Sequence, residues 1–250
     1  MHHETSATQS PLSLVIPVYN EAGNVVPLVQ EIAQSLEGHC EYEIIVVDDG
    51  SDDETLALLQ TMRSGGETRL RILRHAHNLG QSAALRNGVR AARGEWVATL
   101  DGDGQNDPAD IPRLCAVLAE CSGEHRLRLV CGHRVRRKDP WQKRLSSRIA
   151  NAVRGRLLGD AVPDAGCGLK LVHRQAFLDL PFFDHMHRFL PALIESGGGT
   201  VVSVEVGHRP RSHGESKYGV HNRLWVGITD LFGVLWLKRR AKNLICEEVN

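Results

Sequence analysis

The chain has 250 residues, of which 42% are hydrophobic, and thirty basic side chains balance thirty acidic ones. A neutral overall charge argues against a general nucleic-acid-binding protein, and the length suits one α/β domain with or without an appendage. Six cysteines are scattered without a C-x-x-C pair, so we expect free thiols in a reducing cytosol. The polar N-terminus lacks the apolar core of a signal peptide, and no apolar run reaches the roughly 18 residues that span a bilayer.

Short apolar runs alternate with segments of helical periodicity over the first half of the chain. We expect strands at 12–16, 43–47, 70–73, 96–100 and 127–131, each followed by a polar turn. Between them, apolar residues at helical spacing predict helices at 25–36, 54–63, 82–92 and 111–119. This alternation predicts βαβ units and a mostly parallel sheet with helices on both faces.

The second half begins with a strongly basic stretch. Residues 133–156 contain nine Lys or Arg against one acidic residue, and they include a helix expected at about 141–158. A turn at 164–168 leads into an apolar run at 169–172, and a late strand is expected at 201–206. A polar, basic loop at 208–221 then precedes the apolar segment 224–237, which ends in Lys238-Arg239-Arg240.

Four polar clusters stand at the carboxyl ends of the expected strands, where open α/β sheets bind ligands. They are Pro17-Val18-Tyr19-Asn20-Glu21, Asp48-Asp49-Gly50-Ser51-Asp52-Asp53, His77-Asn78-Leu79-Gly80 and Asp101-Gly102-Asp103-Gly104-Gln105. Tyr19 could stack on a nucleobase, and Asp48 and Asp49 could accept hydrogen bonds from a base or ribose, although the second cluster also suits a helix cap. No G-x-G-x-x-G or P-loop follows the first strand, so a nucleotide would be held by carboxylates and a metal.

The fourth cluster has the composition of a site for a hard divalent cation. Asp101, Asp103 and Gln105 offer two carboxylates and an amide, and Mg²⁺ or Mn²⁺ takes oxygen ligands together with substrate phosphates. A metal-free Asp-Gly turn is the alternative. The histidine pairs at 75/77 and 185/187 do not indicate zinc, because no matching cysteine or carboxylate geometry can be argued for them.

Together these motifs resemble the family-2 glycosyltransferases of GT-A fold. Pro17 to Glu21 resembles the opening P-x-Y-N-E, the cluster from Asp48 the D-D-x-S-x-D, residues 78–88 the N-x-G-x(3)-A-x(3)-G segment, and Asp101 to Asp103 the D-x-D. The resemblance covers about residues 12–220 and implies a Rossmann-like α/β sheet, an inverting reaction and a nucleotide-diphosphate sugar as donor. It also implies Mg²⁺ or Mn²⁺ on Asp101, Asp103 and Gln105. The donor-binding residues that it implies are Pro17, Tyr19, Asn20, Glu21, Asp48, Asp49, Gly80, Asp101 and Gly102.

Within that family the chain is similar to dolichyl-phosphate mannosyltransferases and bacterial polyprenyl-phosphate glycosyltransferases. Residues 101–108 resemble their D-x-D-x-Q-x-x-P, residues 143–148 the basic and Ser motif that grips the lipid phosphate, and residues 211–218 the basic loop over the donor diphosphate. The resemblance implies that Arg134, Arg144 and Ser147 bind the acceptor phosphate. It also implies that Arg211 and Lys217, together with the metal-binding Asp103, stabilise the leaving diphosphate.

The role of Asp164 stays open at the level of sequence. A lipid phosphate is already anionic near neutral pH, since phosphate monoesters have a second pKa of ~6, and no general base is then required. Asp164 is the candidate base for a hydroxyl acceptor, and capping a turn or anchoring an arginine is its alternative role. The turn from Asp164 reads D-A-G-C-G-L where the eukaryotic enzymes have D-P-T-S-G-F, which indicates a bacterial branch. The Q-x-x-R-W of processive polysaccharide synthases is not found in the sequence.

The sequence therefore predicts an inverting, metal-dependent transferase that moves one sugar from GDP-mannose or a UDP-sugar to a polyprenyl phosphate. The alternatives are the same donor chemistry with a saccharide or protein hydroxyl as acceptor, and a non-catalytic donor-binding subunit of a membrane complex. The C-terminal pair of transmembrane helices of many bacterial relatives is not found, so we expect peripheral contact with the cytoplasmic face of the membrane through 224–237. The alternatives are that a membrane-protein partner supplies this contact, and that 224–237 is an ordinary helix packed on the domain or a dimer contact.

The expected organisation has three parts. Residues 1–10 form a disordered tail, and residues 221–250 form a C-terminal amphipathic helix and tail. Between them lies a glycosyltransferase domain at 11–220, with a nucleotide-binding part at 11–132 and an acceptor-binding part at 133–220.

Overall fold

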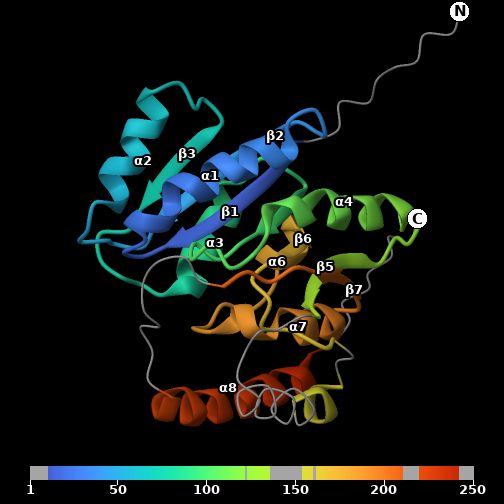
Figure 1. Cartoon of the computed structure of the whole chain (residues 1–250). Coiled ribbons are helices and arrows are strands. Elements are labelled where there is room, and N and C mark those ends of the chain that lie inside the picture. The colour runs from blue at the N-terminus through green and yellow to red at the C-terminus, as the bar shows by residue number, and fades with distance from the viewer. Residues whose placement is uncertain (1–10, 122, 136–153, 160–161, 211–219, 242–250) are drawn as a thin grey trace, which may run out of the picture.

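The computed structural model describes residues 11–121, 123–135, 154–159, 162–210 and 220–241. Within them, a seven-stranded sheet has the order β3-β2-β1-β4-β6-β5-β7 (Figure 1). Its strands are β1 (Leu12–Val18), β2 (Tyr42–Asp48), β3 (Leu70–Arg74), β4 (Trp96–Thr99), β5 (Leu127–Arg134), β6 (Lys170–His173) and β7 (Thr200–Val206). The helices are α1 (Ala22–Leu36), α2 (Thr55–Ser64), α3 (Gln81–Ala91), α4 (Ile111–Glu120), α6 (Arg174–Leu178), α7 (Leu190–Ser196) and α8 (Val220–Arg240), with 3₁₀ turns η1 (Pro108–Asp110) and η2 (Met186–Phe189).

The sheet is mostly parallel, as the sequence predicts. β1 pairs in parallel with both β2 and β4, β2 with β3, and β5 with β7. β6 runs antiparallel between β4 and β5. The strand that follows the turn at 164–168 is thereby inserted beside the strand that precedes Asp101, which brings the second half of the chain to the edge where the polar clusters lie.

Side chains along the central strands alternate between two apolar cores. Leu14 and Ile16 of β1 belong to the core that α1, α2 and α4 cover, whereas Val15 belongs to the core beneath α3, α6 and α7. Figure 1 shows these helical layers on opposite sides of the sheet. Burial on both faces explains why the strands are almost continuously apolar in sequence.

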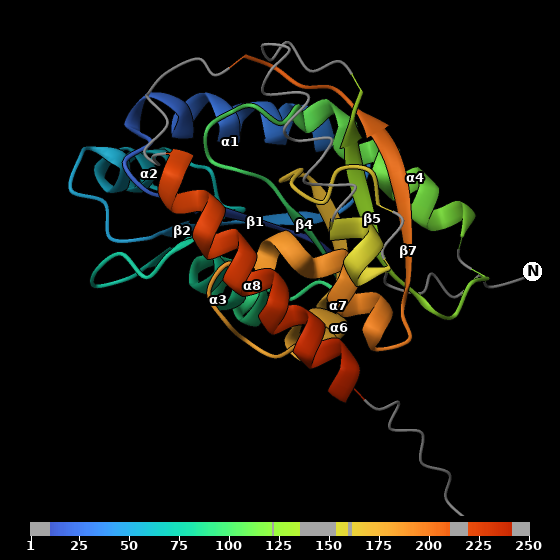
Figure 2. The same ribbon diagram turned by 90° about the horizontal axis from the view of Figure 1, so that it is seen from below.

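The expected C-terminal helix is present as α8, which lies across the layer of α3, α6 and α7 (Figures 1 and 2). Val234 is fully buried in the second core, and Leu231 and Leu235 pack against it. Phe232 and Trp236 are 65% and 59% exposed. Across the described residues, no helix combines the length and the apolar character needed to cross a membrane.

The region between β6 and β7 holds more helix than the sequence predicts. α6, η2 and α7 are each too short for helical periodicity to be recognised. The helix expected at 141–158 is only partly covered, because residues 154–158 are helical and residues 136–153 lie outside the described part of the chain.

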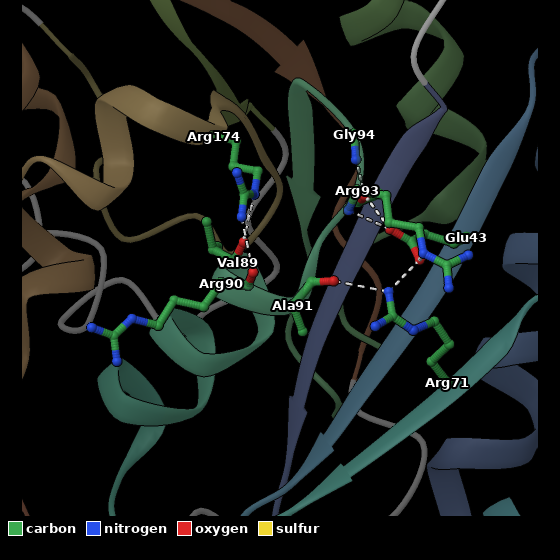
Figure 3. Close-up of polar contacts among 9 residues, drawn as sticks. Glu43, Arg71, Val89, Arg90, Ala91, Arg93, Gly94 and Arg174 are labelled. Carbon is green, nitrogen blue, oxygen red and sulfur yellow. Dashed lines mark hydrogen bonds and ion pairs between the residues drawn. The ribbon is translucent and has the colours of Figure 1, made fainter.

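A buried polar network fixes the end of α3 that lies away from the polar clusters (Figure 3). The Glu43 carboxylate accepts hydrogen bonds from Ser13 Oγ at 2.7 Å, Arg93 N at 2.7 Å and Arg71 Nη1 at 2.6 Å. Burial alone would raise the pKa of Glu43, but these hydrogen bonds lower it below its ordinary value. Arg71 Nη1 also donates to the carbonyl of Ala91, and Arg174 donates to the carbonyls of residues 89 and 90. Arginine side chains thus bind the last carbonyl groups of α3, where a helix leaves carbonyls without intrahelical partners.

Candidate active site

The turns after β1 and β2 are joined side by side. Asn20, with φ of 54°, donates from its backbone N to Ser51 Oγ at 2.9 Å and from Nδ2 to Asp52 Oδ1 at 2.5 Å. The backbone N of Glu21 donates to Thr55 Oγ1 at 2.9 Å, and its carboxylate accepts from Asn24 Nδ2 at 2.6 Å. The structure therefore gives Asn20 and Glu21 a part in holding the first two clusters together, in addition to their predicted role at the donor.

The adjacent carboxylates of Asp48 and Asp49 have different surroundings. Asp49 is 3% exposed, and its oxygens accept from Leu79 N and Gly80 N at 2.9 Å each, with His75 Nδ1 at 2.6 Å from Oδ1. Asp48 accepts from Ser51 N through Oδ1, while its buried Oδ2 has no hydrogen bond and lies 3.6 Å from Arg74 Nε. Asp49 thus anchors the turn before α3, and Asp48 keeps acceptor capacity at the end of β2.

Gly50 allows the second and third clusters to approach closely. Its φ is +75°, and a Cβ at this position would lie 2.7 Å from the carbonyl carbon of His77. Gly102 has a comparable place beside β1, because a Cβ there would lie 2.9 Å from the carbonyl oxygen of Pro17. Gly50 thus lets the second and third clusters pack together, and Gly102 does the same for the first and fourth.

Asp101 and Asp103 meet at the end of β4. Gln81 Nε2 donates to Asp101 Oδ1 at 2.8 Å, and Gln105 N donates to Asp103 Oδ1 at 3.1 Å. Burial raises the pKa of Asp101, and the negative charge of Asp103 raises it further. A like-charge pair of this kind suits a divalent cation, and Gln105, the third predicted ligand, is joined to Asp103 through its backbone N.

Within the described residues, no three His, Cys, Asp or Glu side chains gather as a complete metal site. Magnesium sites commonly use one or two carboxylates and are completed by waters and substrate phosphates. The donor set of Asp101, Asp103 and Gln105 therefore fits Mg²⁺ or Mn²⁺ bound together with a nucleotide diphosphate.

Arg134 and Asp164, predicted for two separate roles, form one ion pair. Arg134 Nε and Nη2 donate to Asp164 Oδ2 and Oδ1 at 2.7 and 2.9 Å, and the Asp164 residue is 4% exposed. Burial alone would lower the pKa of Arg134, but hydrogen bonding and the charge of Asp164 raise it. Arg134 also lies close enough to Asp101 to favour its charged form. The pair therefore belongs to the same region as the D-x-D carboxylates.

Gln81 and Lys170, which the sequence did not single out, also lie beside Asp101. Lys170, 4% exposed at the start of β6, donates from Nζ to the carbonyl of Cys167, and its charge favours the charged form of Asp101. The Ser82 hydroxyl lies 2.8 Å from His187 Nδ1. Burial lowers the pKa of His187 well below its ordinary value, with Arg188 and Lys170 adding to the effect, so the imidazole is neutral. In the sequence, Gln81 directly follows Gly80 and Lys170 directly follows the 164–169 turn. Their positions next to recognised motifs are the sequence features that could have identified them as site residues.

The segment that follows β7 contacts the loop at 101–107. Arg209 N donates to the carbonyl of Gln105 at 3.0 Å, and its guanidinium donates to Glu31 at 2.6 Å and to Asp107 at 2.7 Å. Arg209 therefore lies beside the loop that carries the predicted metal ligands. Arg211, Lys217, Arg144 and Ser147 themselves lie outside the described residues.

Residues 13–180 match the family model of "Glycosyl transferase family 2". The chain belongs to this family. It is 38% identical over 235 residues to a protein of Rhizobium johnstonii named dodecaprenyl-phosphate galacturonate synthase, a match that covers 91% of this chain and 67% of that protein. It is 36% identical over 210 residues to the undecaprenyl-phosphate 4-deoxy-4-formamido-L-arabinose transferase of Pseudomonas aeruginosa, with 83% of this chain and 60% of that protein covered. The chain thus spans about two thirds of the length of these relatives.

Solved structures of the glucosyl-3-phosphoglycerate synthase of Mycobacterium tuberculosis share the fold. The complex with Mn²⁺, UDP and phosphoglyceric acid has a TM-score of 0.67 at 20% identity, covering 94% of this chain and 80% of that one. The complex with Mg²⁺ and UDP has a TM-score of 0.66 at 19% identity, covering 94% and 81%. The predicted GT-A fold is confirmed.

Proposed function

We propose that the protein transfers one sugar, with inversion, from a nucleotide-diphosphate sugar to a polyprenyl phosphate. The observation that carries this proposal is the 38% identity to a relative whose name specifies a dodecaprenyl phosphate and a galacturonate. A second relative, 36% identical, is named for transfer involving undecaprenyl phosphate and a modified arabinose. Among donors, we therefore place a nucleotide-linked uronic acid before GDP-mannose.

We further propose that Asp101, Asp103 and Gln105 hold Mg²⁺ or Mn²⁺ together with the donor diphosphate. The carboxylate pair at the end of β4 supports this assignment, and so do the Mn²⁺ and Mg²⁺ in complexes of proteins that share the fold. Bound there, the cation would act as a Lewis acid on the leaving diphosphate. Asp48 Oδ2, buried without a hydrogen bond, supports a place for a donor hydroxyl or base N–H beside it.

For the acceptor, we assign Asp164 the role of holding Arg134. Both carboxylate oxygens of Asp164 are bound to the Arg134 guanidinium, which leaves this carboxylate poorly placed to remove a proton from a hydroxyl. An anionic lipid phosphate needs no such base. The remaining task of the residues is to align the phosphate with the sugar, and such alignment lowers a barrier by up to roughly 7 to 11 kcal/mol. We propose Arg134, with Arg144 and Ser147, for that alignment.

We propose that α8 rests on the inner face of the cell membrane. Its exposed Phe232 and Trp236 lie on a helix whose last turn carries Lys238, Arg239 and Arg240, and the Arg240 guanidinium lies 5.8 Å from the Trp236 ring centre. Aromatic and basic side chains together suit the interface of an anionic leaflet. Packing through Leu231, Val234 and Leu235 leaves the helix attached to the domain.

Transfer of radiolabelled sugar to lipid tests the proposed function. Purified protein with polyprenyl phosphate, Mn²⁺ and UDP-galacturonic acid, UDP-glucuronic acid, UDP-glucose or GDP-mannose should move label into the organic phase with at least one donor. Excess EDTA or the Asp103→Asn substitution should abolish transfer. Label that instead reaches a saccharide or protein hydroxyl would favour the alternative acceptor, and a folded protein without turnover would favour a non-catalytic subunit.

A further inference from the structure

The first turn of α3 is anchored on both sides of Gln81. Immediately before it, the backbone N–H groups of Leu79 and Gly80 both donate to the Asp49 carboxylate at 2.9 Å. Immediately after it, the Ser82 hydroxyl lies 2.8 Å from His187 Nδ1. Ser82 is 1% exposed and Asp49 is 3% exposed, so both anchors are shielded from water. The backbone of Gln81 therefore has little freedom to move relative to the sheet.

From this fixed position, the Gln81 side chain reaches the predicted metal ligand. Its Nε2 donates to Asp101 Oδ1 at 2.8 Å. A carboxylate only accepts hydrogen bonds, so the amide nitrogen and not the amide oxygen faces Asp101. The contact joins the start of α3 to the end of β4, which are separated by 20 residues in sequence.

The other sides of Asp101 are also confined. Its backbone N donates to Asn106 Oδ1 at 3.3 Å. A Cβ on Gly168 would lie 2.2 Å from Asp101 Oδ2, so that only a glycine leaves room for this oxygen. Asp101 Oδ1 is then held by Gln81, while Oδ2 lies against the backbone of the 164–168 turn. The neutral Gln81 amide restrains the carboxylate without adding a positive charge that would compete with a cation.

We propose that Gln81 is a positioning residue that fixes the orientation of Asp101 for binding a divalent cation. This inference rests on the metal site of the proposed function. Removal of a residue that hydrogen-bonds to a metal ligand typically lowers metal affinity about 10- to 100-fold. Loss of the Gln81 amide should therefore weaken metal binding by that factor without changing the ligands themselves.

The test is direct titration of Mn²⁺, followed by electron paramagnetic resonance, with UDP and separately with GDP present. Gln81→Met keeps the length of the side chain and removes its donor, so its Mn²⁺ Kd should rise about 10- to 100-fold. Gln175→Met is the matched control, because Gln175 Nε2 donates to Asp179 Oδ1 at 2.7 Å on the exposed surface of α6. Its Mn²⁺ Kd should equal that of the wild type. Nucleotide binding without metal should be the same in all three proteins.

Equal Mn²⁺ affinity in wild type and Gln81→Met, with both proteins folded by circular dichroism, would overturn the positioning role and leave the proposed function standing. A wild type that binds no Mn²⁺ with either nucleotide would overturn the metal site and this inference with it. If Gln81→Met does not fold, Gln81→Ala, which is tolerated in the first turn of a helix, takes its place with the same expected result.

Discussion

Arg134 and Asp164 form a two-point ion pair, with Nε and Nη2 donating to Oδ2 and Oδ1 at 2.7 and 2.9 Å. The pair links the end of β5 to the turn before β6, thirty residues later in sequence. In charge-assisted pairs of this geometry the carboxylate fixes the plane of the guanidinium. The proposed phosphate-binding face of Arg134 is therefore oriented by the residue that the sequence offered as a base.

Replacement of Asp164 distinguishes a role as general base from a role in orienting Arg134. Asp164→Asn should raise the KM for polyprenyl phosphate about 10- to 100-fold, because one charge-assisted hydrogen bond to Arg134 is lost. The shape of the pH–rate profile should not change, since no proton is removed by Asp164. Steady-state kinetics across pH 4 to 8, which includes the range where an aspartate titrates, makes the comparison. Disappearance of an acidic limb in the variant would instead identify Asp164 as a general base.

The Glu43 network should make stability depend on pH. The folded-state pKa of Glu43 is lowered, so its contribution to the free energy of unfolding is fully present above the unfolded pKa of about 4.3 and is lost as pH falls through the folded pKa. Glu43→Gln should lower the free energy of unfolding by about 2 kcal/mol at pH 7 and by less at acidic pH. Urea unfolding of the wild type and the variant at pH 7 and at an acidic pH measures the two differences in the free energy of unfolding.

A matched control for Glu43 is Glu95, which is 64% exposed at its side chain and lies 3.4 Å from His173 Nε2. Glu95→Gln should change the free energy of unfolding at pH 7 only slightly. Equal losses in the two variants would show that the buried network has no special contribution.

Substitution of two glycines with the same φ allows the energetic cost of backbone strain to be measured separately from the cost of lost close packing. Gly38 and Gly50 both have φ of +75°, but a Cβ on Gly38 would meet nothing within 4 Å, whereas one on Gly50 would meet the His77 backbone at 2.7 Å. Gly38→Ala should lower the free energy of unfolding by about 1 kcal/mol. Gly50→Ala should cost more and should also weaken nucleotide binding, because the second and third clusters must separate. Similar costs in both variants would contradict the close approach.

The exposed side chains of α8 should govern contact with membranes. Phe232→Ser with Trp236→Ser should weaken sedimentation with anionic vesicles, and binding of the wild type should fall as salt rises. Phe182→Ser is the control, since Phe182 is 49% exposed in the segment between α6 and η2. Binding that is unchanged by the α8 substitutions would place the membrane contact elsewhere.

The sequence predicts the parts of this fold that follow from local pattern. β2 and β4 contain short buried apolar runs, at 44–47 and 97–98, and Asp48 and Asp101 lie at or just beyond the ends of these strands. Contacts between distant segments are not encoded in this way. Gln81 meets Asp101 across 20 residues, where the start of α3 lies beside the end of β4. Ser82 meets His187 across 105 residues, because α3 and η2 pack on the same face of the sheet. The antiparallel insertion of β6, which carries Lys170 to Asp101, likewise depends on tertiary packing.

The most direct test of the central claim is the structure of the product. An α-linked nucleotide sugar, incubated with the protein, Mn²⁺ and polyprenyl phosphate, should yield a lipid whose anomeric proton couples to phosphorus and whose sugar is β-linked. Proton and phosphorus NMR of the purified lipid shows both features. An α-linked product would contradict the single displacement, and a sugar attached to anything other than the lipid phosphate would contradict the proposed reaction.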